Sequence, residues 1–153
     1  MRTRWGVAVT LAGVAIAIAV LPVVGLGKSL SGVRGRMAVR SAQSRFLSLH
    51  GTSRSLAVEL GVPVSFVADL SAQTVTLREG CDGVGRVLES RDFNLSYRVQ
   101  MLSDSGPVRL CMTPRGYADP RSNSFDERGI VTFLRGSQEA SVVLFPLGHA
   151  VRS

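Results

Sequence analysis

Hydrophobic and polar residues follow three successive patterns along the chain. Residues 7–27 carry no charge, and as a helix they would extend about 31 Å, enough to cross the core of a bilayer. Residues 28–61 place apolar side chains three and four positions apart, which is typical of an amphipathic helix. From residue 62 to residue 153, short runs alternate with period two. The pattern predicts a membrane-spanning helix, then an amphipathic helix, then a β domain.

The amphipathic helix has one apolar stripe, which we expect to form the helix side of a core. Its members follow one another at three and four residues and are apolar except at Ser53, while the residues between them are largely serine and arginine. Gly61 and Pro63 are placed to end the helix. The predicted core residues of this stripe are Val39, Ala42, Phe46, Leu49, Leu56 and Leu60.

The β domain is predicted from short apolar runs separated by turn residues. Candidate strands cover residues 62–68, 74–78, 86–89, 93–102, 108–113, 130–135 and 141–147, and residues 116–128 form a long polar loop. Helix first and strands afterwards indicate the α+β class. We therefore expect a long N-terminal helix, half membrane-spanning and half amphipathic, packed on an antiparallel β-sheet domain.

Composition adds a basic balance and one pair of cysteines. The net charge is +7, and 17 of the 18 basic residues are arginine, a usage that genome composition alone can produce. A basic surface attracts nucleic acid or anionic head groups, although here the arginines are spread along the chain. Cys81 and Cys111 are the only cysteines. In an exported domain they suggest one disulfide, with two buried free thiols as the alternative.

The first six residues form a short basic leader with Arg2 and Arg4 before the apolar run. Such a leader fits a cleaved secretory signal, a permanent anchor or a prepilin leader. Small residues at 15, 17 and 19 offer signal-peptidase sites, but the apolar run continues to residue 27. Charges on both sides of the run leave its orientation open.

The sequence offers no pattern for catalysis or for a cofactor. Neither His50 nor His149 has a carboxylate or cysteine at metal-ligand spacing. Asp119, Asp126 and Glu127 share the polar loop, where a solvated loop is favoured over a calcium site. We therefore expect no enzyme activity, no metal, no cofactor and no small-molecule substrate.

Several stretches, taken in order, resemble the type IV pilin-like proteins, and among them the minor pseudopilins of the GspH/FimT kind. Arg4 to Leu11 resembles a prepilin leader, which is cut after a glycine, here between Gly6 and Val7. Residues 41–47 and 53–66 resemble the family's helix end and first strand. Residues 111–118 resemble its strand ending in Pro-x-Gly, and residues 130–133 with 141–152 resemble its closing hairpin. Leu11 stands where the family usually has glutamate.

The resemblance implies a structural subunit of a type II secretion or type IV pilus assembly system. Such a subunit is a single-pass protein of the bacterial inner membrane, with its C-terminal domain in the periplasm or extracytoplasmic space. Its partners would be other pilin-like subunits, contacted through the N-terminal helix.

Two alternatives stay open from the sequence. One is an anchored extracytoplasmic binding domain without a filament role, which as in some relatives could contact nucleic acid, here through Arg135 and Arg152. The other is an exported enzyme with an unrecognised site, which is the least favoured. The secretion or pilus system and the neighbouring subunits cannot be read from the sequence.

Overall fold

The computed structural model describes the backbone of residues 4–153 and the side chains of residues 31–153. The chain divides into two compact units, residues 1–34 and residues 35–153. Helix α1 (Arg4–Leu60) includes all of the described backbone of the first unit. The membrane span predicted over residues 7–27 lies outside the residues whose side chains are described. Within the described part, no helix is long and apolar enough to cross a membrane.

The C-terminal part of α1 buries one face against the β domain. Val39, Ala42, Phe46 and Leu49 are at most 1% exposed. Farther along the helix, Ser53 and Ala57 are fully buried, whereas Leu56 is only partly buried. Gly61 then follows the helix with a φ of 68°, the left-handed conformation that glycine adopts without strain.

Leu60 corrects the predicted core stripe, because it is 42% exposed. A strict alternation of three and four averages 3.5 residues per turn, whereas the α-helix has 3.6. Over five turns this difference adds up to about half a residue, or about 50° of rotation, which moves the buried position from Leu56 towards Ala57. The buried face is also broader than the predicted stripe, because Gln43 and His50, which stand beside it, are each only 6% exposed.

The first sheet has four antiparallel strands in the order β3-β2-β1-β5. Phe66 lies at its centre, opposite Leu77 on one neighbouring strand and Leu110 on the other. All three side chains are fully buried. The strands are β1 (Val64–Asp69), β2 (Thr74–Glu79), β3 (Val87–Asp92) and β5 (Val108–Met112).

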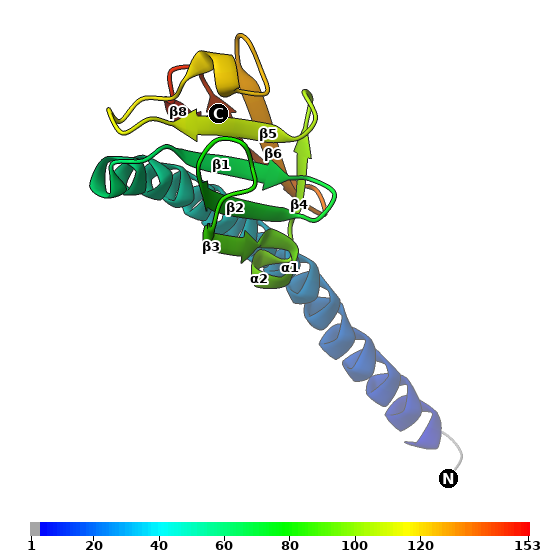
Figure 1. The fold of residues 1–153 in the computed structure, drawn as a ribbon. Helices are drawn as coiled ribbons and strands as arrows, with labels where there is room; N and C mark the ends of the chain where they lie inside the picture. Colours follow the sequence, from blue (N-terminus) through cyan, green and yellow to red (C-terminus); the bar gives the residue numbers. More distant parts are fainter. Residues whose placement is uncertain (1–3) are drawn as a thin grey trace. The chain divides into compact units, whose positions relative to one another are not determined.

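The second sheet also has four antiparallel strands, in the order β4-β6-β7-β8. Phe133 pairs with Met101 on one side and with Ala140 on the other. Figure 1 shows β6 behind β5 and β1, with β4 at one edge. The strands are β4 (Gln100–Ser103), β6 (Gly129–Arg135), β7 (Gln138–Leu144) and β8 (Ala150–Arg152).

Phe46 joins α1 to both sheets in one core. Its ring lies 5.1 Å from that of Phe66 in the first sheet and 5.4 Å from that of Phe133 in the second, measured between centroids. A third ring, Phe93, lies 6.3 Å away. The expected fold class, α+β with a long helix packed on antiparallel sheet, is therefore confirmed for the β domain and the helix segment that it covers.

The strand predicted over residues 93–102 is wrong in its first half. Residues Phe93–Tyr97 form a short helix, α2, before β4 begins. The Asp92 carboxylate accepts a hydrogen bond from the Leu95 amide and caps this helix, and Arg98 ends it in the left-handed conformation with a φ of 53°.

The last predicted strand also differs from the structure. β7 starts at Gln138 rather than at residue 141 and ends at Leu144, three residues earlier than expected. The chain then turns at residues 145–149 and returns as β8, which is too short to show a period of its own. Within the polar loop, Pro120–Ser122 form a single 3-10 turn, η1, capped by the Asp119 side chain.

Candidate functional site

The predicted processing site, Gly6 and Val7, lies outside the residues whose side chains the structure describes. Cleavage of the leader therefore stays a prediction. The described site residues all belong to the β domain or to the part of α1 that packs on it.

Cys81 and Cys111 form a disulfide, with their Cα atoms 5.5 Å apart. Cys111 lies on β5, opposite Ser65 of β1, and Cys81 lies in the turn that follows β2. Since β1 lies between β2 and β5, the bridge crosses the end of β1. It fixes the exposed loop of residues 82–86 to the sheet.

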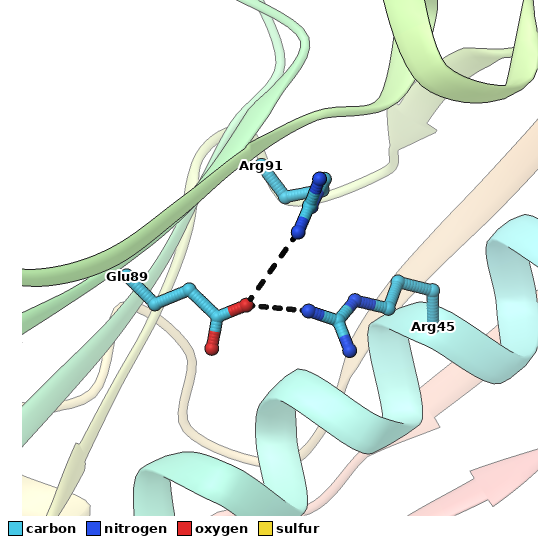
Figure 2. A network of polar contacts seen from close by, with 3 residues as sticks. All are labelled: Arg45, Glu89 and Arg91. Carbon is cyan, nitrogen blue, oxygen red and sulfur yellow. Dashed lines mark hydrogen bonds and ion pairs between the residues drawn. The ribbon is translucent and has the colours of Figure 1, made fainter.

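Polar contacts fasten α1 to both sheets. The Gln43 amide donates to the carbonyl of Ser141 on β7 at 2.7 Å. Arg45 forms an ion pair with Glu89 on β3, 2.5 Å between Nη2 and Oε1, and Arg91 approaches the same oxygen at 4.0 Å (Figure 2). The helix thus reaches the edge strand of one sheet and an inner strand of the other.

His50 is buried below the turn that joins β7 to β8. Among residues 31–153, whose side chains are described, its Nε2 atom has no hydrogen-bond partner, and its ring packs edge-on against Phe66 at 5.8 Å between centroids. Burial, and then the charges of Arg54 and His149, lower the pKa of His50 to about 4. Arg54 in turn donates to the carbonyl of Gly148 in the turn. His50 is therefore a neutral core residue at neutral pH.

The described part of the chain contains no group of three histidine, cysteine or acidic side chains able to hold a metal ion. Asp119, weighed above as a calcium ligand, instead accepts hydrogen bonds from the Arg121 amide and the Ser122 hydroxyl.

Arg135 and Arg152, the predicted nucleic-acid contacts, lie in different surface hollows. Arg152 lines a groove of about 500 Å³ between α1 and strands β7 and β8, called here the β8 groove. Arg135 lines a hollow of about 610 Å³ between α2 and the end of β6, called the α2 hollow. The structure therefore does not bring these two arginines together on one surface.

Each hollow gains arginines that the sequence did not single out. Arg36 and Arg40 stand one helical turn apart on α1 and line the β8 groove beside Arg152. Arg98 lines the α2 hollow beside Arg135. The spacing of Arg36 and Arg40 was a usable signal on the helix. No sequence signal indicated Arg98, because its position depends on helix α2, which was not predicted.

Comparisons with known proteins give a structural likeness without a sequence match. No protein-family model matches the chain, and no curated protein matches it. Two crystal forms of the type IV minor pilin FimU from Pseudomonas aeruginosa do match in structure. The first has a TM-score of 0.59 at 15% identity, covering 77% of this chain and 90% of the pilin chain. The second has a TM-score of 0.55 at 14% identity, covering 74% and 91%.

The fold is pilin-like. This likeness rests on the order of elements, a long helix followed by antiparallel strands, because so low an identity carries no information about individual residues. On the surface of the pilin-like domain the β8 groove and the α2 hollow are each lined by two or more arginines, and polar side chains of α1, among them Gln43, Arg45 and Arg54, hold the helix to the β domain.

Proposed function

We propose that the chain is a minor pseudopilin-like structural subunit, of the GspH/FimT kind, in a type II secretion or type IV pilus assembly system. The observation that carries the proposal is the pilin-like packing of α1 on antiparallel sheets, preceded by an uncharged run of 21 residues at positions 7–27. Proteins of this fold typically have structural rather than enzymatic roles. The subunit is stored in the inner membrane with its β domain outside the cytoplasm.

The mechanism is assembly through the N-terminal helix. An apolar helix leaves lipid for a bundle of like helices, where close packing of small residues replaces contacts with lipid. The run is rich in small residues, with alanines at 8, 12, 15, 17 and 19 and glycines at 13, 25 and 27. Leu11 brings no carboxylate that could neutralise the N-terminus of a neighbour. A subunit of this kind is best placed at the end of a filament, where it needs neighbours on one side only.

Site-specific photo-crosslinking in the native host tests this assembly. A photoreactive residue at Val14, within the apolar run, is expected to capture proteins that carry a pilin-type leader and an apolar N-terminal helix. The same residue at Arg128, exposed on the β domain, serves as the control. Capture of phospholipid alone at Val14, in cells that are assembling filaments, would overturn the proposal.

A second candidate function, nucleic-acid binding by an anchored domain, is favoured by the β8 groove. Three arginines line it, and Arg152 donates to the neutral hydroxyl of Ser44 rather than to a carboxylate. Phosphate contacts by such arginines predict binding that weakens steeply with salt. Fluorescence anisotropy with labelled DNA tests it: Arg152→Gln is expected to weaken binding, and no binding by the unaltered protein at low salt rejects the function.

A further inference from the structure

Arginines flank the turn that joins β6 to β7. Arg135 is the last residue of β6 and lines the α2 hollow. Arg98, which follows α2, lines this hollow as well. On the other side of the turn, Arg36 of α1 donates from Nε to the Gln138 side chain at 3.4 Å. Together Arg36, Arg98 and Arg135 form what we call the basic end of the domain.

The positive charges of the basic end are not neutralised within the described part of the chain. None of its three arginines takes part in an ion pair there. Arg135 donates to the carbonyl of Tyr97, and Arg36 donates to an amide. The α2 hollow has no acidic residue in its lining. These guanidinium groups are therefore available to an external anion.

An exposed leucine accompanies the charges. Helix α2 buries Phe93 in the core and leaves Leu95 81% exposed, three residues before Arg98 and in the lining of the same hollow. A bilayer surface accepts both parts of this combination, because leucine enters the region between head groups and acyl chains while arginine remains at the phosphates. An acidic peptide or a nucleic acid backbone would leave the leucine without an apolar partner.

The chain also holds the basic end near the membrane that the proposed function requires. Gly35 packs closely against the turn. If this residue carried a side chain, its Cβ atom would lie only 3.2 Å from the Cγ atom of Gln138. The predicted span ends at Gly27, eight residues before Gly35. Eight residues extend about 12 Å as a helix and about 28 Å when fully stretched. The basic end therefore cannot move far from the lipid head groups.

We propose that the basic end docks on anionic phospholipid head groups, with Arg36, Arg98 and Arg135 at the phosphates and Leu95 in the interface. This inference rests on the proposed function, because it assumes the membrane span. Docking would orient the β domain before assembly and would be released when the helix leaves the lipid. An arginine near an anionic surface changes the docked-to-free ratio about fivefold, corresponding to ~1 kcal/mol.

The test uses the full chain in nanodiscs of phosphatidylcholine, with and without phosphatidylglycerol. A fluorescent dye is placed by Ser137→Cys on the turn, where the bridged Cys81 and Cys111 leave the new thiol as the one to react. Quenching by lipids brominated in the acyl chain reports docking. We expect stronger quenching in the anionic discs, and loss of the difference at high salt.

Two variants and a control make the outcome specific. Arg98→Asn keeps a residue that tolerates the left-handed conformation and is expected to lower the docked-to-free ratio about fivefold. Leu95→Ser is expected to weaken quenching in the same discs. Arg128→Asn removes an equal charge at the other end of β6 and should change nothing.

The outcomes separate this proposal from the proposed function. Equal quenching in neutral and anionic discs, or equal loss in Arg98→Asn and Arg128→Asn, overturns the docking and leaves the basic end to a protein partner or nucleic acid. A chain that does not remain in the discs at all overturns both proposals.

Discussion

Single residues on one face of α1 determine whether the β domain holds together. Phe46 contacts three other aromatic rings from both sheets and α2, so its side chain is the point at which the separate elements meet. Leu49 is fully buried one turn later. Full burial of each such side chain contributes about 1.5–3 kcal/mol to the free energy of unfolding.

Substitution of Leu49 by aspartate is expected to unfold the domain. The change removes about 1.5–3 kcal/mol of burial and places an unpaired carboxylate in the core, which costs several kcal/mol more. Leu60→Asp is the matched control, because Leu60 is 42% exposed and the new charge can be solvated. Thermal unfolding of both variants in detergent measures the effect. Equal melting temperatures for Leu49→Asp and the unaltered protein would show that this face of α1 is not in the core.

Because His50 is buried in its neutral form, we expect the protein to lose stability in mild acid. Its pKa in the folded protein is about 4, below the ordinary value of 6.5, so the unfolded chain binds more protons between these values. The stabilisation is complete above about pH 6.5 and is lost as the pH falls towards 4. The free energy of unfolding should decrease by about 3 kcal/mol across this range.

His50→Gln measures the contribution of this histidine. The glutamine stays neutral, so the variant should lose the part of the pH dependence that lies between about 6.5 and 4 while keeping the acid titration of the carboxylates below it. Urea unfolding at several pH values gives the comparison. An unchanged pH dependence in His50→Gln would assign the effect to other groups.

Among the elements, the first sheet depends on a covalent link as well as on its strand pairing. The disulfide closes 31 residues (111 − 81 + 1) and fastens the turn after β2 to β5. In the chain-entropy model a closure of this length adds about 3–4 kcal/mol to the free energy of unfolding.

Removing both cysteines should therefore destabilise the domain without rearranging it. Cys81→Ala with Cys111→Ala is expected to lower the free energy of unfolding by about 3–4 kcal/mol while leaving the circular dichroism spectrum unchanged. Mass spectrometry of the non-reduced protein should detect no free thiol. Two free thiols in protein from the native host would contradict the bridge.

Elements with a clear period could be predicted from the sequence, and elements set by local capping could not. The strand around Val75 alternates apolar and polar residues, the strands around Phe66 and Phe133 do so in part, and all three appear near their predicted positions. Helix α2 is fixed by one hydrogen bond from Asp92 and by the left-handed Arg98, and five residues carry too little period to reveal it. Strand β8 was not predicted either, because its three residues are too few to show an alternating pattern.

The candidate surfaces were less predictable than the core. Arg135 and Arg152 are close in sequence, but the hairpin of β6 and β7 and the return strand β8 send them to different hollows. Their neighbours, Arg36 and Arg98, come from segments distant in sequence. The spacing of Arg36 and Arg40 places these two arginines on one face of α1, but only the tertiary arrangement brings Arg36 beside Arg152 and Arg98 beside Arg135.

At the scale of the whole molecule, the sequence continues from an apolar N-terminal run into a pilin-like domain. The likeness to the minor pilin FimU covers 77% of the chain and supports the fold. Assembly requires in addition that the mature N-terminus can be buried among neighbouring helices. A retained leader would carry Arg2 and Arg4 into such a bundle, at a cost of several kcal/mol for each unpaired charge.

The most direct test of the filament role is the N-terminal sequence of the protein purified from its native membrane. A prepilin-type peptidase would cut after Gly6 and leave the apolar run in the mature chain, whereas a signal peptidase would cut near Ala17 or Ala19 and release the domain. We expect a mature chain that begins at Val7. A chain that begins near Val20, or one that keeps Met1, would contradict it.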